Sequence, residues 1–115
     1  MSESHTDVYI ASACRLPIGR FIGGLSSFKV TELGAKAGAA ALERAGVAPD
    51  QVDECIFGNV LSAGVGQNPA RQAALGAGLP PSIGCFTVNM VCGSGMKSII
   101  PLGVSLRYTA FAATA

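Results

Sequence analysis

The sequence predicts an α/β fold in which strands and helices alternate as β-α-β-α-β, with a further helix after the last strand. Three short apolar runs, rich in β-branched and aromatic residues, predict strands at residues 7–14, 53–60 and 85–90. Two segments with helical spacing separate these runs. Strands that are joined through helices run parallel, so we expect the beginning of a parallel sheet.

A glycine-rich loop follows the first expected strand, at residues 15–24, and it contains Arg15 and Arg20. A phosphate-binding loop is one interpretation of such a segment. The order of its glycines matches neither of the common phosphate-binding motifs. We therefore disfavour both a phosphate site and a nucleotide-binding α/β domain.

The first helix is expected from about Val30 to Ala45, where small and apolar residues recur at a spacing of four. Its end is well marked, because Gly46 suits a left-handed residue after a helix and Pro49 blocks further helix. Gly34 and Gly38 would let this helix approach a sheet closely.

The second helix is expected to begin at Pro69, with Asn68 as the residue that caps its first turn. Gly76 and Gly78 close this short helix. The third strand, at residues 85–90, then leads to Cys92.

Cys92 is the candidate catalytic residue, because it stands where a strand turns into a helix. Backbone N–H groups at a helix N-terminus favour an anion and hence the thiolate, which is the nucleophilic form of cysteine. Gly93 and Gly95 leave space around the sulfur and permit the tight backbone of a nucleophile turn. The pattern suits a nucleophile that accepts an acyl group. The alternative is a buried structural cysteine beside a glycine turn.

Composition restricts the other possibilities. The chain has 115 residues, of which 50% are hydrophobic and 13% charged, so it is one domain at most and we expect either a fragment or an oligomer. A net charge of +1 with scattered basic residues indicates no nucleic-acid partner, and no apolar run is long enough to span a membrane. The polar N-terminus resembles no export or transit signal, so we expect a cytoplasmic protein.

Metal and disulfide sites are not expected either. The four cysteines, Cys14, Cys55, Cys85 and Cys92, lack metal-binding spacing, and we expect them to be reduced thiols. The single histidine, His5, lies in the N-terminal tail and cannot complete a metal site.

Several ordered blocks of the sequence resemble the thiolases. Residues 88–97 (VNMVCGSGMK) resemble the segment around the acyl-accepting cysteine of that family, and residues 13–25 (ACRLPIGRFIGGL) resemble its opening. Residues 64–75 (GVGQNPARQAAL) are similar to the family almost residue for residue. The resemblance covers residues 8–99.

This resemblance implies an acyltransferase in which Cys92 takes an acyl group from an acyl-CoA. A second acyl-CoA attacks the thioester in a Claisen condensation, and the reverse reaction is thiolytic cleavage of a 3-ketoacyl-CoA. The residues beside Cys92 are expected to supply a backbone N–H toward the thioester oxygen. Coenzyme A thioesters are substrates, no resident cofactor is expected, and full-length members are expected to form homo-oligomers.

The remaining machinery of the family has no counterpart here. Thiolases are several times longer, and the resemblance places the activating histidine, a second acid–base cysteine and a histidine–asparagine pair in parts that this sequence does not match. We expect residues 1–100 to be the first part of the thiolase N-terminal domain. Residues 101–115, in which we predict neither helix nor strand, are expected to be a tail that does not match the family, left by truncation or a reading-frame change.

Such a fragment is expected to be inactive alone and marginally stable. The first strand would be central in a complete sheet, so residues 8–13 are expected to present an open, apolar edge. Two alternatives remain for function. One is another condensing enzyme of the thiolase fold, and the other is a non-catalytic fragment that pairs with a full-length subunit.

Overall fold

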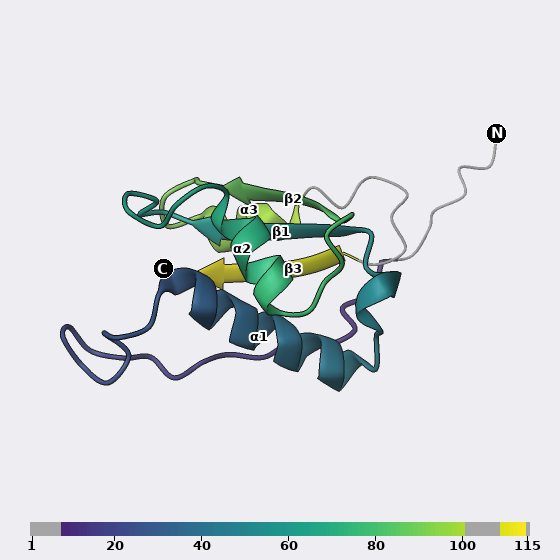
Figure 1. Ribbon diagram of the computed structural model, residues 1–115, viewed down its shortest axis with the longest axis horizontal. Helices are drawn as coiled ribbons and strands as arrows, with labels where there is room; N and C mark the ends of the chain where they lie inside the picture. Colours follow the sequence, from purple (N-terminus) through teal and green to yellow (C-terminus); the bar gives the residue numbers. More distant parts are fainter. Residues whose placement is uncertain (1–7, 101–108, 115) are drawn as a thin grey trace.

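The computed structural model describes residues 8–100 and the backbone of residues 109–114. The elements follow in the order α1 (Val30–Ala45), a 3-10 helix η1 (Pro49–Gln51), β1 (Glu54–Asn59), α2 (Pro69–Gly76), β2 (Gly84–Val88), α3 (Ser94–Ile99) and β3 (Thr109–Thr114). The three strands form one parallel sheet in the order β2-β1-β3 (Figure 1). The predicted α/β class is confirmed.

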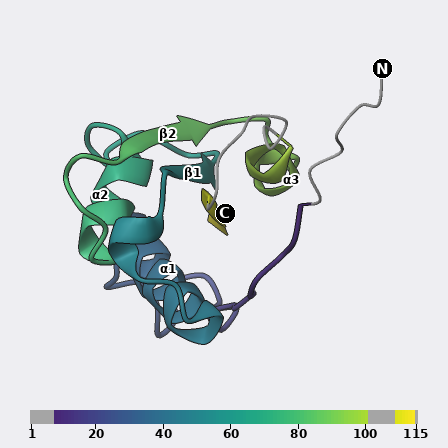
Figure 2. The ribbon, with the colours of Figure 1, turned by 90° about the vertical axis from the view of Figure 1, so that its right-hand side faces the viewer.

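The sheet separates two layers of helix. Figure 2 shows α1 and α2 on one side of the strands and α3 on the other. Residues of β1 face the two layers in alternation. Cys55 and Phe57 join the core cluster with α2, whereas the backbone at Gly58 packs closely against the start of α3. Ile56, between them, is 1% exposed. The core is therefore built around β1, the central strand.

Helix α1 has the bounds that the sequence predicts, and Gly46 ends it in the left-handed conformation at φ 64°. Gly34 explains how closely it packs. A Cβ atom at Gly34 would lie 2.8 Å from Cε1 of Phe57, so only a glycine lets α1 reach the side chains of β1.

Helix α2 also begins as predicted, at Pro69 after the capping residue Asn68. The Asn68 side chain accepts a hydrogen bond from the Arg71 N–H at 3.3 Å. The same side chain donates to the carbonyl of Cys85 at 3.0 Å and accepts from the Thr87 hydroxyl at 3.2 Å. One residue thus caps α2 and ties it to β2.

The prediction of a first strand at residues 7–14 is wrong for the described residues 8–14, which form neither strand nor helix. They run along α1 instead (Figure 1). The Ser12 hydroxyl donates to the carbonyl of Ala41 at 2.6 Å, and the Cys14 thiol donates to that of Ala37 at 2.9 Å. The Arg44 side chain donates to the carbonyl of Ala13 at 2.9 Å. Contacts with a helix replace the expected ladder of strand bonds.

The place beside β1 is taken by β3, from the segment in which the sequence predicts no strand. β3 pairs in parallel with β1 along its whole length, from Glu54 opposite Thr109 to Asn59 opposite Thr114. The expected open edge at residues 8–13 is therefore also wrong, since the outer strands of the sheet are β2 and β3. Residues 1–7, 101–108 and 115, with the expectations for His5 and for most of the tail, lie outside the described residues.

Candidate active site

Cys92 lies in the turn that joins β2 to α3, and its side chain is exposed. Gly93 caps α3, so Cys92 precedes the capping residue instead of forming part of the helix end. The left-handed residue of the turn is Val91, with φ 46°, whereas Gly93 has an ordinary φ of −88°. The tight backbone conformation predicted at Gly93 and Gly95 is thus adopted by Val91, a β-branched residue for which this conformation is strained.

Hydrogen bonds from polar side chains hold this strained turn on both sides of Cys92. The Val91 N–H donates to Oδ1 of Asn89 at 3.0 Å. The Ser94 hydroxyl donates to the Val91 carbonyl at 2.6 Å and accepts from the Met90 N–H at 2.9 Å. Ser94 is 3% exposed, so its hydroxyl bonds within the protein.

The turn is also fastened to the central strand. The Asn89 amide donates to the carbonyl of Val60, just after β1, at 3.0 Å. Gly58 of β1 lies directly beneath the first turn of α3, where a Cβ atom would stand 2.6 Å from the Ser94 carbonyl oxygen. Roles for Asn89, Ser94 and Gly58 are not predicted from the sequence. The signal that could have pointed to Asn89 and Ser94 is that a polar residue stands on each side of the candidate nucleophile.

Two backbone N–H groups beside Cys92 are already used inside the turn. The Gly93 N–H donates to the Met90 carbonyl at 2.9 Å, and the Ser94 N–H donates to the Val91 carbonyl at 3.1 Å. The expectation that neighbouring residues offer an N–H to a thioester oxygen is therefore not met by these two groups in this conformation.

The other cysteines lie away from this turn. All four cysteines lie within the described residues and are free thiols. Cys55 and Cys85 stand near the amino ends of β1 and β2, whereas Cys92 follows the carboxyl end of β2. No hydrogen bond joins the Cys92 sulfur to another described residue.

A pocket of about 410 Å³ opens at the carboxyl end of β1. Its walls come from the start of α1, from Asn59, from the loop after β1 and from Gln72 of α2. The Gln72 amide shapes the loop by donating to the carbonyls of Val65 and Gln67 at 2.9 and 2.8 Å. Cys92 is not among the lining residues.

Within residues 8–100 and 109–114, no group of three or more His, Cys, Asp or Glu side chains is placed to hold a metal ion. Within the same residues, no helix has the length and apolar character needed to cross a membrane.

Comparisons with known proteins agree with the resemblance in the sequence. The family model described as "Thiolase, N-terminal domain" matches residues 8–110. The chain is 60% identical over 93 residues to a cytosolic acetyl-CoA acetyltransferase of Gibberella zeae, a match that covers 81% of this chain and 24% of the relative. It is 57% identical over 100 residues to a mitochondrial acetyl-CoA acetyltransferase of Xenopus tropicalis, covering 87% and 24% respectively.

A solved structure shares the fold. The Acat5 thiolase from Ascaris suum, crystallised in complex with coenzyme A, superposes with a TM-score of 0.82 at 45% identity, covering 84% of this chain and 25% of that one. The chain thus spans about a quarter of the length of the relatives that it matches. Since the family model covers most of its residues, the chain belongs to the thiolase family, through the N-terminal domain.

Proposed function

We propose that this chain carries the acyl-accepting cysteine of a thiolase-type acyl-CoA acyltransferase, and that Cys92 is this residue. The observation that carries the proposal is the exposed Cys92 thiol in a strained strand-to-helix turn. Asn89 and Ser94 hold that turn from both sides. A nucleophile must be accessible and held in one geometry, and this arrangement supplies both.

The proposed reaction begins with attack of the Cys92 thiolate on the carbonyl carbon of an acyl-CoA. The thioester bond to coenzyme A breaks, coenzyme A leaves as its thiol, and the acyl group stays on Cys92. The carbanion of a second acyl-CoA, formed by loss of an α-proton, then attacks this thioester; a C–C bond forms, the C–S bond to Cys92 breaks, and the Cys92 thiolate is restored. In the reverse direction Cys92 attacks the 3-keto carbon of a 3-ketoacyl-CoA, the C–C bond breaks and an acyl-CoA leaves, and the thiol of coenzyme A then takes the acyl group from Cys92. Support for coenzyme A thioesters as substrates comes from the names of the relatives and from the bound coenzyme A of the Ascaris suum protein.

The described residues provide only part of such a site. Within them no hydrogen bond joins the Cys92 sulfur to a basic side chain, and the N–H groups of Gly93 and Ser94 are occupied. The activating groups would come from the remaining three quarters of a thiolase. We therefore expect the 115-residue chain to show no turnover by itself in either direction.

We also propose where the protein is located in the cell and how its full-length form assembles. A cytoplasmic location is supported by the cytosolic relative, although other relatives are mitochondrial. We expect a homo-oligomer for the full-length form. The second candidate function is a non-catalytic fragment that pairs with a full-length subunit. It is favoured because, among the described residues, no basic side chain forms a hydrogen bond with the Cys92 sulfur.

A chimera tests the catalytic proposal. The corresponding N-terminal part of the Gibberella zeae acetyltransferase is replaced by residues 8–99 of this chain, and thiolysis of acetoacetyl-CoA is measured. We expect activity that Cys92→Ala abolishes and Cys14→Ser leaves unchanged. An active chimera that keeps its activity after Cys92→Ala would refute the assignment. An inactive chimera that folds and binds coenzyme A would favour the non-catalytic fragment.

A further inference from the structure

Two thiols lie side by side in the sheet, far from the turn that holds Cys92. Cys55 of β1 and Cys85 of β2 are register partners in neighbouring parallel strands. Such strands lie about 4.8 Å apart, and disulfides join residues with Cα atoms about 4.4–6.8 Å apart. Partners in register also direct their side chains to the same face of a sheet. The strand pairing therefore places the Cα atoms of Cys55 and Cys85 within the range over which a disulfide can form.

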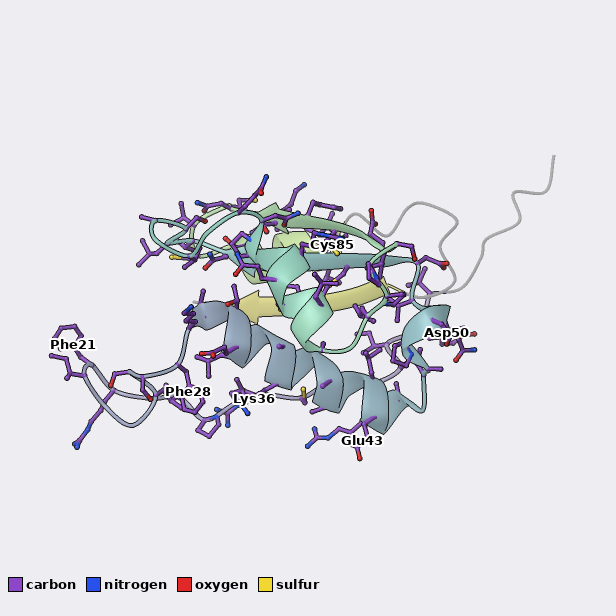
Figure 3. The ribbon with its side chains drawn as sticks, in the orientation of Figure 1. Phe21, Phe28, Lys36, Glu43, Asp50 and Cys85 are labelled. Atoms are coloured by element: carbon purple, nitrogen blue, oxygen red, sulfur yellow. The ribbon has the colours of Figure 1, made fainter. Side chains whose placement is uncertain are left out.

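The two thiols differ in their access to solvent. Cys55 is 1% exposed and belongs to the core cluster with Phe57 and the alanines of α2. Cys85 is partly buried on the outer strand β2 (Figure 3). Its thiol donates to the carbonyl of Ile83 at 3.7 Å. A reagent from solvent can therefore reach Cys85, whereas Cys55 is enclosed in the core cluster.

A cation stands next to the accessible thiol. Arg71 of α2 donates to the carbonyl of Pro81 at 3.0 Å and to that of Ile83 at 3.4 Å, which fixes its guanidinium at the amino end of β2. Burial raises the pKa of Cys85, and the charge of Arg71 opposes this effect. Burial, followed by the proximity of Cys85, raises the pKa of Cys55 to about 12. Its access to solvent and the neighbouring charge of Arg71 therefore favour Cys85 over Cys55 as the thiol that an oxidant attacks first.

We propose that Cys55 and Cys85 form a dithiol site that hydrogen peroxide oxidises to a disulfide across β1 and β2. The Cys85 thiolate attacks one peroxide oxygen, the O–O bond breaks, and the departing hydroxide takes a proton to become water. This leaves Cys85 as a sulfenic acid. The Cys55 sulfur then attacks the Cys85 sulfur, the S–O bond breaks, and the hydroxide released takes the Cys55 proton to form a second water. The two thiols lose two electrons and peroxide gains them.

Peptide mapping of the oxidised full chain tests the site. Folded protein is treated with hydrogen peroxide, remaining thiols are blocked, and the digest is analysed without reductant. We expect a cross-linked peptide pair containing Cys55 and Cys85, a mass loss of two hydrogen atoms, and reversal by dithiothreitol. The matched control is the same reaction in urea. In the unfolded chain Cys85 should favour Cys92, which is closer in sequence and easier to reach by loop closure.

Variants separate the role of Cys85, which peroxide attacks, from that of Cys55, which completes the disulfide. Cys55→Ser should abolish the cross-link and leave a Cys85 sulfenic acid that dimedone traps, whereas Cys14→Ser should form the cross-link as the parent chain does. A folded chain whose main disulfide joins any other pair would overturn the proposal. So would the absence of a cross-link between Cys55 and Cys85 in the oxidised folded chain, whether or not dimedone labels Cys92. Because the mapping of the parent chain needs no substitution, misfolding of a variant does not affect the main result.

Discussion

Gly58 and Ser94 are in direct backbone contact, and this contact joins the central strand to the turn that carries Cys92. A Cβ atom at Gly58 would lie 2.6 Å from the Ser94 carbonyl oxygen and 3.0 Å from the Gly95 nitrogen. Neither of these atoms belongs to a flexible side chain that could move aside. The position of α3, and with it that of Cys92, therefore depends on the absence of a side chain at residue 58.

We expect Gly58→Ala to lower the free energy of unfolding by about 1–3 kcal/mol, the usual cost of overpacking. Chemical denaturation of the parent chain and the variant measures this difference. Gly84→Ala is the matched control, because Gly84 also lies in a strand but has no atom within 4 Å of an added Cβ. Equal destabilisation by both substitutions would contradict the proposed clash with Ser94.

The cap of α2 provides a second prediction. Asn68→Ala should lower the free energy of unfolding by about 0.5–2 kcal/mol, because the cap and the bonds to β2 are lost together. Asn68 has φ 41°, so Asn68→Gly removes the same side-chain bonds but tolerates the backbone conformation. We expect denaturation midpoints in the order parent, Asn68→Gly, Asn68→Ala. A variant Asn68→Ala as stable as the parent would show that the cap contributes nothing.

The elements that the sequence predicts correctly have local signals. Helix α1 carries its apolar spacing and its glycine stop, and α2 carries the Asn68–Pro69 start, so their bounds follow from neighbouring residues. The strands β1 and β2 follow from short runs of apolar residues. The position of Cys92 after a strand and before a helix follows from the same local pattern.

The errors concern pairing between distant segments. Residues 8–14 have the composition of a strand, yet their polar groups bond to α1, and β3 occupies the edge of β1. Which segment pairs with β1 depends on contacts across most of the chain, and composition does not determine it. The left-handed Val91 was missed for a related reason, since the bonds of Asn89 and Ser94 stabilise a conformation that valine alone disfavours.

The buried thiol of Cys55 predicts a loss of stability in alkali. Burial, Cys85 and Glu54 raise its pKa from 9.0 to about 12 in the folded chain. Below pH 9.0 Cys55 keeps its proton in both the folded and the unfolded chain, and its contribution to stability is fully present. Above pH 9.0 the unfolded chain releases this proton first. The free energy of unfolding should therefore fall as the pH rises from 9.0 toward about 12, by at most about 1.4 kcal/mol per pH unit for this group.

Denaturation at a series of pH values, with a phosphine reductant present, measures this slope. Cys55→Ala is the comparison, because it removes the titrating group and leaves Cys85, Glu54 and Arg71 in place. We expect a shallower decline in the variant. Parallel curves for the two proteins would show that Cys55 does not titrate between these limits.

Alkylation rates should rank the four thiols by their access to solvent. Cys92 is exposed, Cys14 and Cys85 are partly buried and Cys55 is buried. With iodoacetamide at neutral pH we expect Cys92 to react first and Cys55 last, as measured by peptide mass at successive times. Labelling in urea provides the control, since unfolding should remove the difference. Protection of Cys92 in the folded chain would be inconsistent with an accessible nucleophile.

Rapid quenching with acid gives the most direct test of Cys92 as the acyl acceptor. The chimera that carries residues 8–99 is mixed with acetyl-CoA, without a second substrate. It is then quenched and digested, and the masses of its peptides are measured by mass spectrometry. The proposed function predicts an acetyl group on the peptide containing Cys92, removable by hydroxylamine and absent after Cys92→Ala. An active chimera that carries the acetyl group on another residue, or on none, would contradict it.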